Sequence, residues 1–505
     1  MYRFIRNFVR LARLAWILAR HNALFPLQTL GVAPAITAVA RIVARRNAPG
    51  RPGQRLAAAF QQMGPSFIKL GQALSTRADL LSPDVADDLT ALQDHLPPFA
   101  GAVARQIVEA DLGRPIPSLF ASFDDIPIAA ASIAQVHYAV TSDGQEVAVK
   151  VLRPKIEQAF ARDLELLYWL AELVEAAQPQ FRRLRPVASV AIFAEQVRIE
   201  MDLRMEAAAC AELGENFVGD AHYRTPRVDW QRTSQRVLTT ERVQGIAIDE
   251  RAALVAAGHE PDTILRRAAE AFFYQVFRDG FFHGDMHGGN AFVLADGCVV
   301  PVDFGIMGRV DTATRGYLAE LLIGFLRQDY RAVAEVQFRA GYVPPEKSIE
   351  VFAQACRSIG EPIFGKPSNQ ISIARLLAQL FRVTEQFEMS VQPELLLLQK
   401  TMLMAEGMGL RLNPDVNIWQ LAQPLIEQWM ARHFSPPAQA LRALGELRLL
   451  AQRLPRLIDN IETLAEARRR EAEQQALRPR RWSHVQIAEI AVLLALAVAL
   501  VALLV

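Results

Sequence analysis

The sequence predicts an α+β fold, in which a small mixed segment of strands and helices precedes a longer helical one and a membrane helix ends the chain. Three observations lead to this prediction. Alternating apolar residues indicate strands at 134–140, 147–151 and 236–241. Helical periodicity runs through most of 155–218 and again from 311 to about 475, and the last residues are apolar. At 505 residues the chain is long enough for two or three domains.

The composition argues against several classes of protein. Lys and Arg number 55 against 54 Asp and Glu, and the net charge of +1 gives no general reason to expect nucleic acid as a partner. The three cysteines, Cys210, Cys298 and Cys356, are odd in number and form no CxxC pair. We therefore expect neither a disulfide framework nor a cysteine zinc site, and cytosolic exposure of most of the chain fits.

The first 46 residues carry a basic amphipathic pattern. Arginines recur every three or four positions opposite apolar residues, namely Arg3, Arg6, Arg10 and Arg13 opposite Phe4, Phe8, Leu11 and Trp16. Such a helix suits an anionic membrane surface, so residues 1–46 are expected to be membrane-proximal. A core-facing helix with solvated arginines explains the pattern equally well. Breakers and charges at 45–53 indicate a linker, after which residues 54–120 are expected to form a helical extension.

The stretch QEVAVKVL, residues 145–152, predicts a strand whose three valines share one face and whose Lys150 lies on the other. A lysine in an apolar strand is expected to meet an anion, here the phosphate oxygens of a nucleotide, with Glu206 of the following helical segment as its orienting partner. An edge strand with its lysine in water is the alternative. Asp202 lies four residues before Glu206, so we expect the two carboxylates on one helix face, where they would repel unless cations compensate.

The segment HGDMHGGN, residues 283–290, precedes a predicted hairpin. Apolar runs at 291–294 and 298–302 flank an Asp-Gly turn, and the second run ends at Asp303. Asp285, Asn290 and Asp303 thus have the spacing of a kinase-type site. In such a site the first faces the acceptor and the other two hold Mg²⁺ on the nucleotide phosphates.

Zinc or another transition metal is the alternative interpretation of this segment. On a strand, His283, Asp285 and His287 would lie on one face and offer three ligands. The glycines between and after them favour a loop, and a metal site of this kind would leave Asn290 and Asp303 without a role.

A glycine-rich phosphate loop is absent from the region before Lys150. No glycine occurs between Gly113 and Gly144, and IAAASIAQVH, residues 128–137, takes that place. Alanine does not adopt positive φ as cheaply as glycine, so this turn is expected to be stiffer and to approach phosphates differently. An ordinary protein kinase is therefore not predicted.

The chain ends in an apolar stretch. Residues 490–505 are uninterrupted by polar side chains, and from 485 onward only Gln486 and Glu489 interrupt. The stretch approaches the ~20 residues needed to span a bilayer, so we expect a single transmembrane helix at 484–505. Six arginines between 468 and 481 precede it and indicate that the body of the chain faces the cytoplasm. A helix buried against a partner is the alternative.

Together these features resemble the UbiB family of atypical kinase-like proteins, which includes the ADCK proteins of mitochondria and the UbiB proteins of bacteria, the latter being the more similar. The resemblance covers residues from about 60 to 310. It rests on four features. The alanine-rich loop of the family is matched by Ala129 to Ser132 with Ala134, and its strand lysine and helix glutamate are matched by Lys150 and Glu206. Its KxGQ stretch is matched by Lys69, Gly71 and Gln72, and its ExD stretch by Glu200 and Asp202. The usual HADPHPGN reads HGDMHGGN here but keeps Asp285 and Asn290.

The resemblance implies a bilobal protein-kinase-like fold with a helical N-terminal extension, an N-lobe at 121–245, a helical C-lobe at 246–475 and a C-terminal transmembrane helix. It implies ATP and Mg²⁺ as cofactors, with Asp285, Lys150 and Glu206 as catalytic residues and Asn290 and Asp303 as metal ligands. The KxGQ and ExD residues would be regulatory, and the KxGQ region would lie over the active site and block protein substrates. The implied nucleotide contacts are Ile128, Ala129, Ala130, Ala131, Ser132, Ile133, Ala134, Gln135, Val136, Lys150, Glu241 and Val243.

The function that the resemblance implies is atypical kinase or ATPase chemistry in support of ubiquinone biosynthesis at the bacterial inner membrane, and not protein phosphorylation. Membrane lipids, quinone precursors and other ubiquinone-biosynthesis proteins are the expected partners. Two alternatives stay open: a small-molecule phosphotransferase of the aminoglycoside- or choline-kinase type, and a nucleotide-gated scaffold for a lipid-pathway complex. The KxGQ stretch and the alanine loop speak against the first. The sequence names neither the phosphoryl acceptor nor the oligomeric state.

Overall fold

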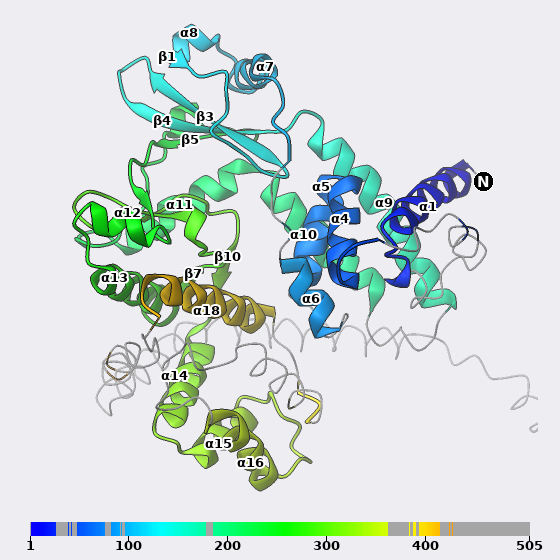
Figure 1. Cartoon of the computed structure of the whole chain (residues 1–505), viewed down its shortest axis with the longest axis vertical. Coiled ribbons are helices and arrows are strands. Elements are labelled where there is room, and N and C mark those ends of the chain that lie inside the picture. Colours follow the sequence, from blue (N-terminus) through cyan, green and yellow to red (C-terminus); the bar gives the residue numbers. More distant parts are fainter. Residues whose placement is uncertain are drawn as a thin grey trace, which may run out of the picture. The chain divides into compact units, whose positions relative to one another are not determined.

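The computed structural model describes residues 2–26, 48–75, 82–90, 96–177, 185–361 and 393–414, with a few single positions between and beyond them (Figure 1). No helix within these ranges is long and apolar enough to cross a bilayer. The predicted span at 484–505 lies outside the described residues, as does the predicted C-lobe beyond residue 427.

A five-stranded antiparallel sheet forms the first part of the kinase-like region. Its order is β1-β3-β4-β5, with β2 beside β3. The strands are β1 (Phe120–Phe123), β2 (Ala129–Ala130), β3 (Ala134–Thr141), β4 (Glu146–Leu152) and β5 (Val237–Glu241). The three predicted strands are therefore confirmed. Val147, Val149 and Val151 are buried on one face of β4, which leaves Lys150 on the other.

Two helices cover the valine face of this sheet, α7 (Gly101–Leu112) and α8 (Ile116–Leu119). Their apolar side chains share one core with the valines, because the sheet must bury that face against another layer. The predicted boundary at residue 120 placed both helices in the N-terminal extension, whereas their packing joins them to the sheet.

The N-terminal extension is a helical cluster packed on α9 (Ile156–Ala177), and consists of α1 (Tyr2–Arg20), α4 (Pro52–Met63), α5 (Pro65–Ser75) and α6 (Pro83–Thr90). Helix α4 begins inside the predicted linker 45–53, because Pro52 is well suited to the first turn of a helix. In α1, Leu11 and Leu18 are buried in the cluster, and Arg6 and Arg10 pair with Glu165 of α9. This packing is what the core-facing interpretation of the pattern predicts.

The predicted placement of Asp202 and Glu206 on one helix face is wrong, and each carboxylate is compensated by a cation, Arg204 and Lys150 respectively. The chain leaves helical geometry between α10 (Pro186–Glu200) and α11 (Leu203–Asn216), and Asp202 is the N-cap of α11. Its carboxylate accepts a hydrogen bond from the Arg204 backbone N–H at 3.1 Å and pairs with the Arg204 side chain at 2.7 Å. An aspartate there satisfies a helix N–H that has no partner in the first turn, so the Asp202 carboxylate is engaged by Arg204.

The second part of the kinase-like region contains short strands among helices. Strands β6, β8 and β9 form one small sheet and β7 with β10 another. The elements are β6 (Ile246–Ala247), α12 (Arg251–Ala256), α13 (Pro261–Phe273), η3 (Tyr274–Asp279), β7 (Phe281–His283), η4 (Gly288–Asn290), β8 (Ala291–Val293), β9 (Val299–Pro301), β10 (Met307–Arg309), α14 (Thr312–Leu326), α15 (Tyr330–Arg339), α16 (Ile349–Gly360) and α18 (Pro393–Leu412). The predicted hairpin is confirmed as β8 and β9, and Gly297 takes φ +77° in its turn.

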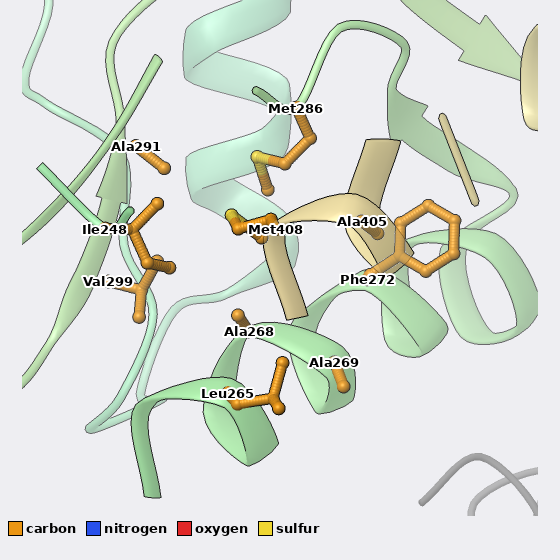
Figure 2. Close-up of a pocket in the computed structure, with 10 residues that line it drawn as sticks. All are labelled: Ile248, Leu265, Ala268, Ala269, Phe272, Met286, Ala291, Val299, Ala405 and Met408. Carbon is orange, nitrogen blue, oxygen red and sulfur yellow. The ribbon is translucent and has the colours of Figure 1, made fainter. Parts of the chain in front are cut away.

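Helix α18 packs on α13 and on the segment that follows β7. Met408 and Ala405 of α18, Met286 and residues of α13 surround a cavity of about 20 Å³ (Figure 2). The cavity has room for about one water molecule, but its lining side chains are apolar, so it is expected to stay dry. It is a packing gap behind the 283–290 loop and not a ligand pocket.

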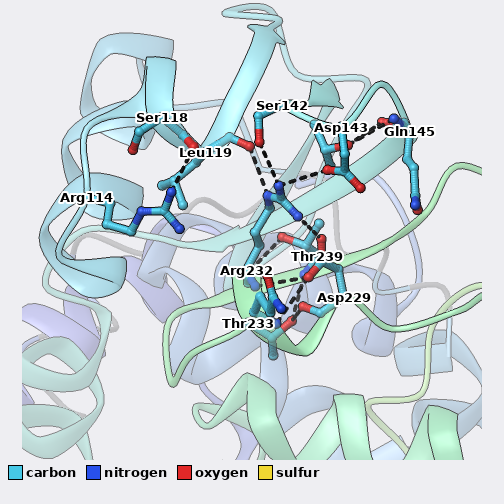
Figure 3. A network of polar contacts seen from close by, with 12 residues as sticks. Arg114, Ser118, Leu119, Ser142, Asp143, Gln145, Asp229, Arg232, Thr233 and Thr239 are labelled. Carbon is cyan, nitrogen blue, oxygen red and sulfur yellow. Dashed lines mark hydrogen bonds and ion pairs between the residues drawn. The ribbon is translucent and has the colours of Figure 1, made fainter.

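One arginine side chain links three segments at the border of the five-stranded sheet by hydrogen bonds and ion pairs. Arg232, in η2 (Trp230–Arg232), is 12% exposed and donates to the Leu119 carbonyl at 2.9 Å, to Ser142 at 3.0 Å and to Asp143 at 3.0 Å (Figure 3). It also pairs with Asp229 at 2.6 Å. The guanidinium thereby joins the start of β1, the β3–β4 turn and the approach to β5.

Candidate functional site

Three predicted site residues from distant parts of the chain meet at the inner face of β4. The Lys150 ammonium lies 2.7 and 3.0 Å from the two carboxylate oxygens of Glu206 and 3.3 Å from Oδ1 of Asp303. Strand β4 lies between β3 and β5, and the Lys150 side chain is 17% exposed, so the edge-strand alternative is wrong. Val136, one of the predicted nucleotide contacts, is the β3 partner of Lys150.

The two acids of this cluster differ in environment. Glu206 is 7% exposed, and burial raises its pKa to about 7, with Asp303 adding to the effect and Lys150 opposing it. The Asp303 side chain is 44% exposed. Burial raises the pKa of Asp303, but Lys150, the Gly305 N–H and other positive neighbours outweigh it and hold that pKa well below its usual range. The pKa of Lys150 is raised in spite of its burial, because both acids favour its charged form. Asp303 is thus the carboxylate that is charged near neutral pH.

The loop after β7 carries Asp285 and Asn290. The Asn290 side-chain NH₂ donates to the Asp285 carbonyl at 3.2 Å, and the Asn290 carbonyl accepts from Val302 N–H at 3.0 Å. The second contact holds the loop against the strand that leads to Asp303, so all three predicted oxygen-bearing residues are held in one connected unit. An amide oxygen and a carboxylate are donors that suit Mg²⁺, which binds through few protein ligands and keeps several waters.

The two histidines of HGDMHGGN hold the loop together. His283 is buried, its Nε2 donates to the Asp303 carbonyl, and its Nδ1 accepts from Asp285 N–H at 3.2 Å. Burial lowers the pKa of His283, so the ring is neutral. His287 accepts from Gly289 N–H at 3.1 Å and caps η4.

The transition-metal interpretation of these histidines is therefore wrong. Both ring nitrogens of His283 are already used, and β7 ends at His283, so no strand places Asp285 and His287 on its face. Within the described ranges, no three His, Cys, Asp or Glu side chains are grouped so that they could hold a metal ion.

The alanine-rich turn is fixed from two sides. Ala131 N–H donates to the Ala134 carbonyl at 2.8 Å, and the Arg153 guanidinium donates to the Ala131 carbonyl at 2.8 and 3.0 Å. Ser132 is fully buried, and its hydroxyl has no hydrogen-bond partner within the described part of the chain. Ile128 and Ala129 are exposed at the edge of this turn, and Ala130 and Ala131 are half-buried.

Two side chains predicted to contact the nucleotide are used elsewhere. The Gln135 amide is fully buried and bonds the backbone of Phe99, at 2.9 Å to its N–H and 3.1 Å to its carbonyl. Glu241 pairs with Arg224 at 2.8 Å, and although burial raises the pKa of Glu241, its arginine neighbours lower it overall. Glu241 is the last residue of β5, and Val243 lies in the segment that connects β5 to β6. Because the Glu241 side chain is paired with Arg224, a ligand would bind to backbone groups of this segment.

Comparisons with known proteins agree with this geometry. Family models described as "ABC1 atypical kinase-like domain" and "UbiB helical domain" match residues 91–337 and 356–417. A Marinobacter nauticus protein named "Probable protein kinase UbiB" is 43% identical over 437 residues, which are 85% of this chain and 79% of the relative. Relatives of the same name from Aeromonas hydrophila (43%; 82% of this chain, 77% of the relative) and Azotobacter vinelandii (40%; 88% and 83%) are similar. The chain belongs to the UbiB family.

A solved structure supports the kinase-like fold of this UbiB chain. The complex of Rv3197 with erythromycin from Mycobacterium tuberculosis matches with a TM-score of 0.52 and 25% identity, over 74% of this chain and 95% of that one. The predicted kinase-like fold, with both helices and sheets, is thus confirmed.

The KxGQ stretch comes close to the cluster through Lys69, and its helix precedes the region that the ABC1 model matches. Lys69 of α5 lies 3.0 Å from Glu200, with both side chains about one-tenth exposed or less, and is close enough to help lower the pKa of Asp303. A Cβ on Gly71 would lie 2.7 Å from the Phe60 ring, so only glycine lets α5 pack this closely on α4. Gln72 donates to the Leu92 carbonyl at 3.4 Å. Asp202 makes a local contact with Arg204.

Lys400 was not among the residues predicted from the sequence. This residue belongs to α18, within the UbiB helical domain, and its ammonium lies 3.3 Å from Oδ1 of Asp285. A signal was present, because LLLLQKTML puts one lysine in an apolar run. The reasoning that a lysine in an apolar element needs an anion, applied to Lys150, applies here too.

Proposed function

We propose that this UbiB chain is an ATP-dependent enzyme of the phosphotransferase type, an ATPase or regulatory kinase that supports ubiquinone biosynthesis at the bacterial inner membrane. The main support for the proposal is the contact of Lys150 with Glu206 and with Asp303, which lies 153 positions later in the sequence. It supplies a cation for phosphate oxygens, an acid that orients this cation, and a carboxylate for a metal ion. The family resemblance and the predicted C-terminal span support the pathway and the membrane location.

The residues present fit the nucleotide and its metal. Lys150 would hold phosphate oxygens, and the buried hydroxyl of Ser132 is a donor in need of an acceptor. Asn290 and Asp303 would hold Mg²⁺, which when bound offsets negative charge on the phosphates. Asp285, held by Asn290 at its backbone, would orient the attacking hydroxyl or water and accept its proton.

Protein substrates are not part of the proposal. Helix α5 is tied to α10 through Lys69 and Glu200, and Leu70 of α5 shares a core with Ile133 of the alanine turn. This packing puts a helix beside the nucleotide turn and near Asp303, where an extended polypeptide acceptor would need room.

The test is Mg²⁺-dependent ATP turnover by the full chain in lipid, with and without phenolic quinone precursors. Asp285→Asn is expected to lower turnover by roughly 10²–10⁴-fold, the usual contribution of general acid–base catalysis, while nucleotide still binds. Asp296→Asn, in the nearby hairpin turn, is the matched control and should behave as wild type. Equal turnover in wild type and Asp285→Asn would contradict the proposal, and nucleotide binding without turnover in the wild type would indicate a scaffold.

A further inference from the structure

Lys400 contacts the predicted catalytic acid from a helix far along the chain. Its Nζ lies 3.3 Å from Oδ1 of Asp285, and the two side chains are 30% and 27% exposed. The pair is therefore half-buried and still open to a ligand. Within the described ranges, His287 is the other basic side chain that reaches this carboxylate, at 3.9 Å, and it is charged only when protonated.

Helix α18 is attached to the catalytic loop beside this contact. The Thr401 hydroxyl is fully buried, 3.1 Å from the Gly284 carbonyl. Met408 packs in one core with Met286 of the loop (Figure 2). Further along the helix, Arg411 pairs with Asp249 at 2.7 Å. The position of Lys400 is thus fixed by buried packing and not by a flexible surface contact.

The catalytic loop itself brings no permanent cation to the acceptor side of the site. Between Asp285 and Asn290 the chain reads Met-His-Gly-Gly, and Lys150 is engaged by Glu206 and Asp303. Phosphoryl transfer gathers negative charge on the transferring group, and a preorganised cation there is among the strongest means of stabilising it.

Lysine is also rare in this chain. The sequence contains 6 lysines and 49 arginines, and three of the six, Lys69, Lys150 and Lys400, contact acids in or beside this site. A compact ammonium with three donors approaches a phosphoryl oxygen in ways that a planar guanidinium does not. Most ion pairs in the described part of this chain use arginine. A lysine at position 400 therefore favours a role in the chemistry over a purely structural ion pair.

We propose that Lys400 is a catalytic residue whose ammonium binds the oxygens of the terminal phosphoryl group during transfer. The inference rests on the proposed function. The acceptor oxygen bonds to the terminal phosphorus as the bond from phosphorus to the bridging oxygen breaks. The electron pair of that bond leaves with ADP, and the acceptor proton passes to Asp285. Lys400 keeps its proton throughout and moves its contact from Asp285 to the phosphoryl oxygens.

The test compares Lys400→Met, Lys400→Arg, Asp285→Asn and Arg411→Met in the full chain. Lys400→Met is expected to lower Mg²⁺-ATP turnover by about 10²–10³-fold, as loss of one preorganised donor does. Affinity for the non-hydrolysable analogue AMP-PNP should fall about tenfold, whereas affinity for ADP, which lacks the terminal phosphoryl group, should not change. Lys400→Arg should give intermediate turnover. Arg411→Met removes another ion pair of α18 and should retain wild-type turnover.

Each other outcome overturns the inference. Wild-type turnover in Lys400→Met, with loss in Asp285→Asn, would refute the role of Lys400 and leave the proposed function standing. Equal loss of ADP and AMP-PNP affinity, or equal loss of turnover in Arg411→Met, would show that Lys400 acts only by seating α18. Turnover that Asp285→Asn does not change would overturn the proposed function and this inference with it.

Discussion

Replacing Lys150 by methionine removes the cation shared by two acids. Its ammonium is 2.7 Å from Glu206 and 3.3 Å from Asp303, and the Glu206 side chain is 7% exposed. Breaking a buried ion pair by deleting one partner costs about 3–5 kcal/mol, because the remaining charge is left buried. We expect a cost at the upper end of this range only where Glu206 stays ionised, since a carboxyl group can take up a proton instead.

The cost should therefore increase with pH. In the folded wild type the pKa of Glu206 is about 7, above its ordinary value, so the native state binds this proton more tightly and loses stability as pH rises towards 7. Without Lys150 that pKa should rise further, towards the ~8–9 known for buried glutamates. At pH 5.5 Glu206 is protonated in both proteins, so the only charge–charge contact that is lost is the one with Asp303. Above pH 7 the variant loses about 1.4 kcal/mol more per unit of pKa rise, or about 2 kcal/mol by pH 8.5.

The titration of Lys150 itself does not change the predicted direction, in which the cost of Lys150→Met increases with pH. Its own folded pKa is raised above the ordinary value of a lysine, so the stability it contributes is fully present throughout this range of pH and would be lost only in strong alkali. The titration of Lys150 therefore adds no pH dependence of its own to the cost between pH 5.5 and 8.5. The slope of the difference between the proteins then reports Glu206.

Hydrogen exchange of peptides covering β3 and β4 measures the prediction, as the free energy of local opening at pH 5.5, 7.0 and 8.5 after correction for intrinsic exchange rates. Lys347→Met is the control, because Lys347 pairs with an exposed glutamate, Glu388, at 2.7 Å and should leave β4 unchanged. A cost for Lys150→Met that is the same at all three pH values would refute the coupling to Glu206. A cost no larger than that of the control would refute the buried pair.

Two substitutions and one reactivity measurement test the fold. Arg232→Ala should lower the unfolding free energy by about 2–4 kcal/mol, because a largely buried guanidinium loses hydrogen bonds to several partners, with Arg114→Ala, which loses one exposed hydrogen bond, as the control in thermal unfolding. Gly71→Ala should cost about 1–3 kcal/mol by overpacking, whereas Gly407→Ala, where an added Cβ meets nothing, should be neutral or stabilising in the same assay. Burial raises the pKa of two of the three buried thiols to about 12, so the folded protein should react with a thiol reagent far more slowly than the unfolded chain.

Local patterns were enough to predict the sheet and the hairpin. Alternation in β4 and the Asp-Gly turn between β8 and β9 are set by neighbours in the sequence, so they could be predicted without knowledge of the fold. An anionic partner of Lys150 was also predictable, because a buried ammonium needs a counter-charge, and Glu206 was predicted in that role. The contact of Lys150 with Asp303, which was predicted as a metal ligand, was not predicted. The predicted helix pairing of Asp202 with Glu206 failed because a capping aspartate looks like any other helical acid until the break after Met201 is seen.

Contacts between distant elements explain the remaining differences. Nothing in the spacing of α1 distinguishes a membrane face from a face packed on α9, because both are apolar with arginines at the border. Gln135 was assigned to the nucleotide from its place in the alanine loop, yet β3 alternation turns its amide to the backbone of Phe99. Position in a motif predicts that a residue is near a site, but the side on which its side chain lies depends on the layer packed against it.

The three site lysines show how far one physical rule extends. Lys69, Lys150 and Lys400 each occur in an apolar stretch, and each meets an acid: Glu200, Glu206 with Asp303, and Asp285. The rule that such a lysine needs an anion predicts that a partner exists, but it chooses the partner only where candidates are few. For Lys400 the partner lies 115 positions earlier in the chain, and helix α18 brings the two together through buried contacts of Thr401 and Met408. The C-terminal helical domain is therefore more than a support for the kinase-like region, because it supplies a cation directly to the predicted catalytic acid.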